Sequence, residues 1–81
     1  MKRVLKDKST GHIQIRTLRP ELGLNYVNGL SAPLYDEAGE LFYEDPQNPE
    51  RNKLRLVADC SNLKDANNLK DALIQARENL K

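Results

Sequence analysis

The hydrophobic pattern changes its period once along the chain, and this change constrains the fold more than any other feature. Between residues 11 and 58 the apolar residues form short runs, separated by turns that contain proline, glycine or asparagine. From residue 61 onward they recur every three or four positions, as on one face of a helix. Strands followed by one helix predict an α+β fold: a small antiparallel sheet of roughly three to five strands, joined by hairpins and covered on one face by a C-terminal α-helix.

Short apolar runs predict the strands of this sheet. The clearest is the alternation of Ile13, Ile15 and Thr17 with polar residues, which is typical of a half-buried strand. Further strands are expected at residues 24–27, 34–35, 41–43 and 53–58. Asn28-Gly29 favours a type I′ turn after the first of these, and residues 36–40 favour a longer hairpin loop. The sheet face away from the helix is expected to be solvated or to form a binding surface.

A helix is expected over residues 62–80. Ser61 or Asn62 is a suitable N-cap for it. At about 100° per residue, the apolar stripe that packs on the sheet consists of Leu69, Leu73, Ala76 and Leu80. Leu63 and Ile74 lie to one side of this stripe, where a partner helix, a second copy of the chain or another segment of this chain would cover them.

Residues 1–10 are strongly basic and weakly patterned. Val4 and Leu5 are enough to start a short edge strand; otherwise this segment is expected to be a mobile arm. Since 81 residues leave no room for a second core, residues 1–81 are expected to form a single domain.

The charges of the chain come in three blocks. Residues 1–19 carry six basic residues and one acidic residue, residues 20–50 carry seven acidic residues and no basic one, and residues 51–81 carry seven basic and four acidic residues. The net charge of +1 hides this separation. Because surface potential steers partners, blocks of opposite charge point to surfaces that bind charged partners.

The residue inventory argues against an enzyme, a metal centre and a bound cofactor. His12 is the only histidine and lies on the polar side of its strand. Cys60 is the only cysteine, and no Cys-x-x-Cys or His-x-x-x-His spacing could hold a metal. A single cysteine precludes an internal disulfide, which favours a cytoplasmic protein. No apolar run reaches the ~20 residues that a membrane span needs, so a small soluble domain without a membrane partner is expected.

Two tyrosines and a phenylalanine interleave with five carboxylates in residues 35–45. This composition is typical of a docking surface in which aromatic anchors are surrounded by charge, and its partner would be basic. The structural alternative is that the rings complete a small core, while the carboxylates keep an edge strand from aggregating. The protein-binding candidates are Tyr35, Asp36, Glu37, Glu40, Tyr43, Glu44, Leu63 and Ile74.

Basic residues at both ends of the predicted sheet suggest a second type of partner. If the first and last strands are neighbours, Arg16 and Arg55 share the open sheet face, and this face with the basic arm would bind the phosphates of double-stranded nucleic acid. Aromatic residues for stacking are missing there, which disfavours single strands. The nucleic-acid-binding candidates are Lys2, Arg3, Lys6, Lys8, Arg16, Arg19, Lys53 and Arg55.

Two hypotheses of function follow. The first is a small non-enzymatic protein-interaction module, an accessory, inhibitor or adaptor protein of bacterial or phage type, that acts through separate acidic and basic surfaces. Blocks of both signs also allow head-to-tail self-association. The second is a domain that binds double-stranded nucleic acid through its basic arm and strands. The first ranks higher, because the seven carboxylates of the middle block would repel phosphate.

Overall fold

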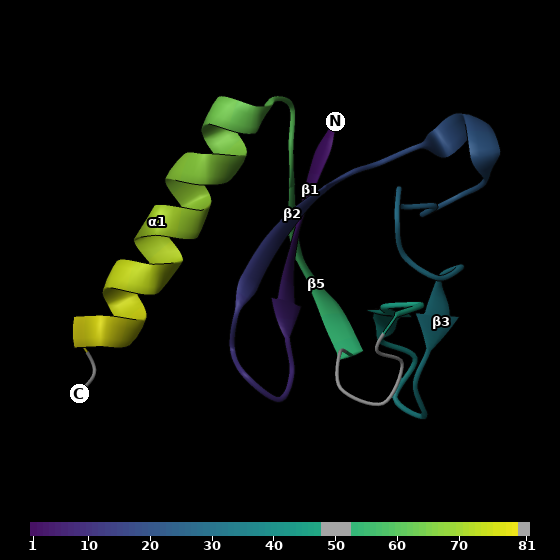
Figure 1. The fold of residues 1–81 in the computed structure, drawn as a ribbon, viewed down its shortest axis with the longest axis horizontal. Helices are drawn as coiled ribbons and strands as arrows, with labels where there is room; N and C mark the ends of the chain where they lie inside the picture. Colours follow the sequence, from purple (N-terminus) through teal and green to yellow (C-terminus); the bar gives the residue numbers. More distant parts are fainter. Residues whose placement is uncertain (48–52, 80–81) are drawn as a thin grey trace.

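Five antiparallel strands form one sheet, and a single helix covers one of its faces (Figure 1). The computed structural model describes residues 1–47 and 53–79. Its elements are β1 (Lys2–Asp7), β2 (Ile13–Thr17), the 3-10 helix η1 (Pro20–Leu22), β3 (Leu34–Tyr35), β4 (Leu41–Glu44), β5 (Lys53–Cys60) and α1 (Leu63–Asn79). The strand order is β2-β1-β5-β4-β3. The predicted α+β class, with strands first and a C-terminal helix, is confirmed.

The basic N-terminal segment forms an interior strand, which corrects the expectation of a mobile arm or a short edge strand. β1 pairs with β2 on one side and with β5 on the other. Val4 and Leu5 are both fully buried, and since successive residues of a strand point to opposite faces, β1 contributes to both layers of the fold. The sequence concealed this strand because three of its six residues are cations, and Arg3 is neutralised by a residue near the end of β5.

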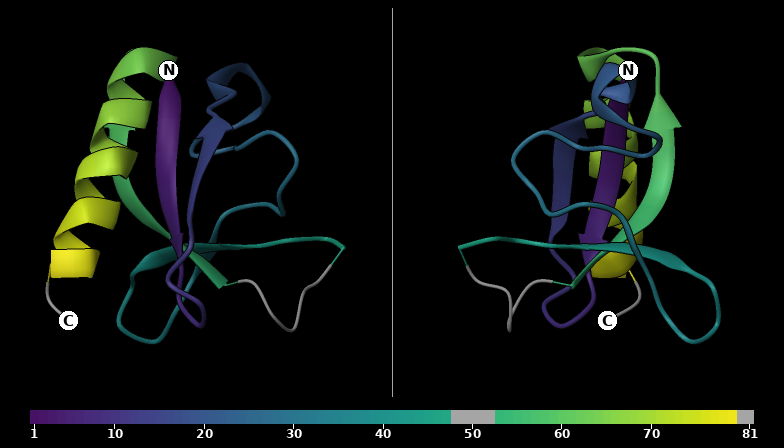
Figure 2. Two further views of the ribbon diagram at one scale, coloured as in Figure 1. Left: turned by 60° about the vertical axis from the view of Figure 1, so that its left-hand side comes forward. Right: turned by 90° about the vertical axis from the view of Figure 1, so that its right-hand side faces the viewer.

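An irregularity in β5 bends the sheet. Val4 pairs with Ala58 and Leu5 pairs with Leu56, so Val57 is an extra residue on β5. Such a bulge increases the local twist of a strand. In Figure 2, β4 crosses the lower end of β1 and β5 at a steep angle, and the sheet curls around the chain segment that follows β2.

Residues 18–31 cover the sheet face opposite the helix. The expectation that this face is solvated or forms an open binding surface is therefore wrong. Val27 and Leu30 pack there with Leu5, Tyr43 and Leu54 to form the main core.

The expected strand at 24–27 with a hairpin at Asn28-Gly29 is wrong. Asn25 adopts a positive φ of 62° and Gly29 one of 83°, which turns the chain twice in five residues. Only an isolated bridge between Leu18 and Val27 remains of the pairing. The apolar residues of this segment fill the core instead of extending the sheet.

The hairpin of β3 and β4 matches the sequence prediction. Leu34 pairs with Phe42 and Tyr35 pairs with Leu41. Its loop is held by Asp36, whose side-chain Oδ1 accepts hydrogen bonds from the backbone N–H groups of Ala38 and Glu40, both at 2.9 Å. The sequence also predicts a loop over residues 45–52, which contains two prolines and no apolar residue; residues 48–52 of it lie outside the described residues.

The helix α1 is capped as predicted, but the face that it turns toward the sheet differs from the predicted one. The Oδ1 atom of Asn62 accepts a hydrogen bond of 2.8 Å from the N–H of Asp65, so Asn62 is the N-cap. The residues that turn toward the sheet are Ala66, which is buried, and Leu69, Lys70, Leu73 and Ile74, which are half-buried.

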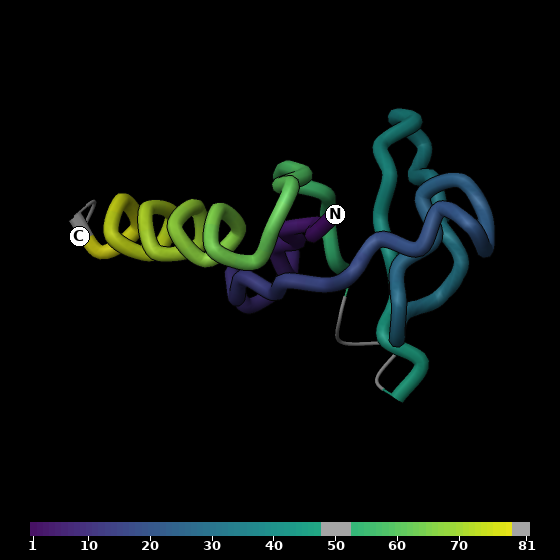
Figure 3. Tube along the Cα trace, turned by 90° about the horizontal axis from the view of Figure 1, so that it is seen from above, coloured from purple at the N-terminus to yellow at the C-terminus, as the bar shows by residue number. Residues whose placement is uncertain are grey.

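The stripe of α1 that packs on the sheet is therefore rotated about the helix axis by part of a turn from the predicted stripe. Ala76 is exposed, whereas Ile74 faces the sheet. Leu80 lies outside the described residues. In Figure 3 the helix projects to one side of the sheet, and the β3–β4 hairpin lies at the other end of the molecule.

Candidate functional site

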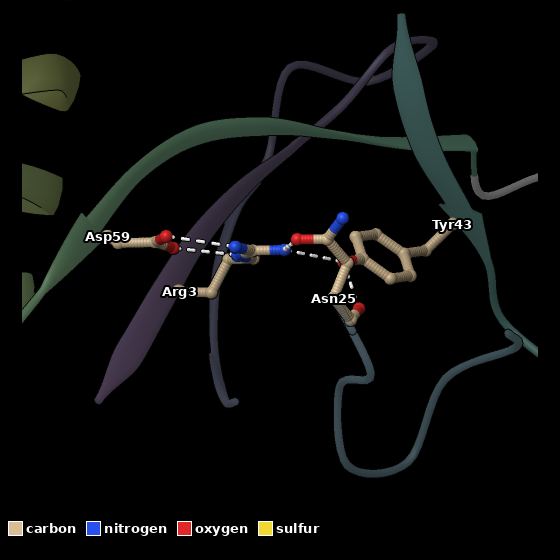
Figure 4. A network of polar contacts seen from close by, with 4 residues as sticks. All are labelled: Arg3, Asn25, Tyr43 and Asp59. Atoms are coloured by element: carbon tan, nitrogen blue, oxygen red, sulfur yellow. Dashed lines mark hydrogen bonds and ion pairs between the residues drawn. The ribbon is translucent and has the colours of Figure 1, made fainter. Parts of the chain in front are cut away.

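A buried arginine organises the polar contacts between the strands and the loop that covers them (Figure 4). Arg3 is only 4% exposed. Its Nε and Nη2 atoms donate hydrogen bonds to the two carboxylate oxygens of Asp59, at 2.7 and 2.9 Å. Its Nη1 atom donates to the hydroxyl of Tyr43 at 2.7 Å and to the side-chain oxygen of Asn25 at 3.2 Å. The guanidinium is therefore shared between β5, β4 and residues 18–31.

The hydroxyl of Tyr43 completes this Arg3 network, because it also donates to the backbone carbonyl of Asn25. The hydrogen bonds to Asp59 outweigh the desolvation of Arg3 and raise the pKa of its guanidinium. Burial raises the pKa of the Tyr43 hydroxyl, against the opposing effect of Arg3. The hydrogen bonds to Asp59 keep Arg3 charged and burial keeps Tyr43 neutral, while the network fixes Asn25 in its left-handed conformation.

Asn25 also connects the network to two exposed apolar residues, Tyr35 through its side chain and Leu24 as its neighbour in the chain. The Nδ2 atom of Asn25 lies 3.5 Å from the hydroxyl of Tyr35 on β3. The neighbouring Leu24 is 84% exposed, and Tyr35 is 60% exposed. Glu37 and Glu40, in the loop that follows Tyr35, are exposed as well. We call Leu24, Tyr35, Glu37 and Glu40 the Tyr35 surface.

The acidic and basic blocks of the sequence meet where β4 pairs with β5. Phe42 pairs with Arg55 and Glu44 pairs with Lys53. The Nη2 atom of Arg55 lies 3.2 Å from a carboxylate oxygen of Glu40 and 3.7 Å from one of Asp36. Part of the hairpin's negative charge is therefore balanced within the molecule.

The structure separates the protein-binding candidates. Tyr35, Asp36, Glu37 and Glu40 lie together on the hairpin, whereas Tyr43 is fully buried in the core and holds the Arg3 network. Glu44 is half-buried in β4.

The two helix candidates lie elsewhere. Leu63, in the first turn of α1, is 51% exposed, and Ile74 lies half-buried in a cleft farther along the helix. The predicted set therefore does not form one surface.

The nucleic-acid-binding candidates are also dispersed, and several are already paired. Arg3 pairs with Asp59, Arg19 with Glu21, and Arg55 with Asp36 and Glu40. Lys2 donates a hydrogen bond to Thr17, and Arg16 donates to Gln14. Lys6 lines the cleft beside α1, whereas Lys8 and Lys53 line a separate pocket near the hairpin.

Arg16 and Arg55 do not share a face of the sheet. Arg16 pairs with Arg3 and Arg55 pairs with Lys6 on β1. Cross-strand partners project from the same face, and Arg3 and Lys6, three positions apart, project from opposite ones.

His12 and Cys60 lie at opposite ends of β1. Cys60 pairs with Lys2, whereas His12 precedes Ile13, which pairs with Lys6. His12 is exposed and Cys60 is half-buried. Within residues 1–47 and 53–79, no group of three or more histidine, cysteine or carboxylate side chains is placed to hold a metal ion. In the same ranges, no helix is long and apolar enough to cross a membrane.

Comparison of the chain with protein-family models, with curated proteins and with solved structures gave no match. The site is therefore defined by its geometry alone. Sequence reasoning missed Leu24 and Asn25, because both fell in a segment assigned to a strand. A hint was available at Asn25, since asparagine tolerates positive φ better than most residues.

Proposed function

We propose that the protein is a non-enzymatic protein-binding module that docks a basic partner on the Tyr35 surface. The observation that carries this proposal is the exposure of Tyr35, which directly precedes the acidic hairpin loop; Leu24, next to its contact Asn25, is exposed as well. An aromatic anchor ringed by charge is a common centre of a protein interface. The carboxylates of Glu37 and Glu40 would attract and orient a basic partner.

The rigidity of this surface supports the same proposal. Asp36 ties the hairpin loop through two backbone hydrogen bonds, and the Arg3 network holds the segment that carries Leu24. A surface that is ordered before binding loses less conformational entropy when its partner arrives. A small apolar area is then enough for a specific, weak-to-moderate complex.

Binding to double-stranded nucleic acid is less well supported. Three of the four arginines proposed for it are paired with carboxylates, so their contribution to phosphate binding would require these ion pairs to break. A fluorescently labelled random duplex at low salt tests this alternative. Binding that weakens steeply with added salt would favour it over the docking of a protein.

Selection from a phage-displayed random peptide library tests the proposal without a known partner. We expect enriched peptides to combine lysine or arginine with an apolar or aromatic residue. The double variant Tyr35→Ser, Glu37→Lys should weaken binding of these peptides by at least about tenfold, which corresponds to roughly 1.4 kcal/mol. The control Asp71→Lys reverses one charge on the exposed part of α1 and should leave the affinity unchanged.

Two results would count against the Tyr35 surface. One is an enriched set without basic residues. The other is a folded double variant that binds the selected peptides with wild-type affinity and salt dependence. Thermal unfolding of both variants checks that the substitutions leave the fold intact.

A further inference from the structure

The helix and the sheet are separated by a cleft of about 380 Å³. The buried residue Ala66 holds the N-terminal half of α1 close to the strands. Toward Asn79 the helix diverges from them, as Figures 1 and 2 show from different directions. The cleft lies along this diverging half of α1 and faces β1, β2 and β5.

The walls of the cleft are largely apolar. Ile13 of β2 and Val57 of β5 line one side, and Leu73 and Ile74 of α1 line the other. Val57 is 38% exposed, and the other three are half-buried. The cleft between them leaves these four side chains partly open to a ligand. The volume falls in the range of roughly 300–1,000 Å³ that is usual for small-molecule sites.

Two cations line the same cleft. Lys6 projects from β1 and Arg77 from the last turns of α1. The ammonium group of Lys6 has no hydrogen-bond or ion-pair partner in the part of the chain that the structure describes. Glu78 is the carboxylate that lines the cleft with them. The lining thus has an excess of positive charge beside apolar walls.

Arg77 is held in place by the β1–β2 turn. Its Nη2 atom donates a hydrogen bond of 3.3 Å to the carbonyl of Thr10. Its guanidinium lies against Gly11, where a Cβ atom would come within 2.6 Å of Nη1. Gly11 has a φ of +78°, a backbone conformation that favours glycine. Arg77 is therefore a positioned cation rather than a freely moving one.

We propose that this cleft binds a small amphipathic carboxylate, such as a medium-chain fatty acid. The hydrocarbon chain lies between Ile13 and Val57 on the sheet and Leu73 and Ile74 on the helix, where it displaces water from apolar surface. The carboxylate is bound by Lys6 and Arg77 through charge-assisted hydrogen bonds. This site is separate from the Tyr35 surface, and neither proposal depends on the other.

Titration of the ¹⁵N-labelled protein with decanoate, below the concentration at which decanoate forms micelles, tests the proposal. We expect saturable chemical-shift changes at the amides of Gly11, Ile13 and Ile74. Lys6→Gln and Arg77→Gln should each weaken binding by about tenfold, the effect of losing one charge-assisted hydrogen bond. The matched control Lys64→Gln changes an exposed lysine in the first turn of α1 and should bind decanoate like the wild type. Well-dispersed amide spectra show that each variant is folded.

Two ligands of the same chain length separate charge recognition from unspecific apolar adsorption. Decanol should bind at least about tenfold more weakly than decanoate, and decyltrimethylammonium more weakly still, because Lys6 and Arg77 repel it. The proposal is overturned if the three ligands bind alike, if the shift changes map elsewhere, or if both glutamine variants retain wild-type affinity.

Discussion

A buried arginine requires a partner for its charge and for its donors, because an unpaired buried charge is among the most destabilising features of a protein. Arg3 meets this requirement through Asp59, Tyr43 and Asn25. Asp59 remains one-third exposed, so the pair keeps partial contact with water and its desolvation is incomplete. Replacing both partners by apolar residues would therefore cost less than removing one of them. We regard the specific placement of residues 18–31 as the main consequence of the network.

Tyr43→Phe tests this network at the level of one hydroxyl group. Its removal leaves the carbonyl of Asn25 and one donor of Arg3 without this partner, so we expect the free energy of unfolding to fall by about 1–3 kcal/mol at neutral pH. Denaturant unfolding of the two proteins measures the difference.

Wild type and Tyr43→Phe should also differ in how their stability depends on alkaline pH. Since burial raises the pKa of Tyr43 above its ordinary value of 10.0, the folded state favours the neutral hydroxyl. This contribution to stability is present below pH 10 and is lost as the pH rises from there through the raised pKa. The phenylalanine variant lacks this loss. Identical alkaline stability profiles for wild type and variant would contradict the buried position of the hydroxyl.

At the scale of the element, the side chain of Asn62 accepts a hydrogen bond from a backbone N–H group at the start of α1 that has no carbonyl partner within the helix. Asn62 caps the N–H of Asp65, and the side-chain amide of Asn62 lies 3.3 Å from the carboxylate of Asp65 in return. The first turn of a helix has unpaired N–H groups and a partial positive charge, so both contacts stabilise it.

Asn62→Ala should lower the free energy of unfolding by about 1 kcal/mol, because it removes this cap. Asn68→Ala is the matched control: Asn68 is exposed in the middle of α1, where alanine favours the helix, so this variant should be as stable as the wild type or slightly more so. Denaturant unfolding followed by circular dichroism measures both. Equal losses for the two variants would mean that Asn62 has no special role.

The sequence predicted those elements whose signals are local. The alternation around Ile15, the hairpin of β3 and β4, the strand that begins at Lys53 and the helix all depend on residues close in the chain. β1 could not be predicted in the same way, because its burial depends on Asp59, 56 residues away from Arg3.

The face of the helix and the docking surface were predicted only in part, for the same physical reason. Which stripe of α1 packs is decided by the twist of the sheet, so Ile74 turned inward and Ala76 outward. The acidic hairpin was recognised, but Leu24 lies in a segment whose path depends on the contacts of Asn25 with Arg3 and Tyr43. Contacts between distant segments leave no periodic signal in a single sequence.

The whole molecule has two layers of unequal packing on the two faces of its sheet. One layer is the core of Leu5, Val27, Leu30, Tyr43 and Leu54. The other is the interface with α1, which is tight at Ala66 and loosens toward the cleft. Local stability should follow this difference, since segments with few buried contacts open at lower free energy.

Amide hydrogen exchange should therefore divide the chain. We expect the amides of β1 and β5 to exchange only through global unfolding, and those of the last turn and a half of α1 to be at least about tenfold less protected. The first turns of the helix, around Ala66, should be intermediate or as protected as the strands. Uniform protection along the whole of α1 would show that helix and sheet open as one unit.

The interior place of β1 also determines when the molecule can assemble. β1 is synthesised before β5, the strand that covers one of its edges and ends at Cys60. Until then β1 can pair only with β2, and such an isolated pair of strands is marginally stable in water. The nascent chain must keep this apolar segment from pairing with other chains until β5 has been synthesised. The lysines that obscured β1 as a strand, Lys2 and Lys6, would help during this interval, since charges discourage edge-to-edge association of unpaired strands.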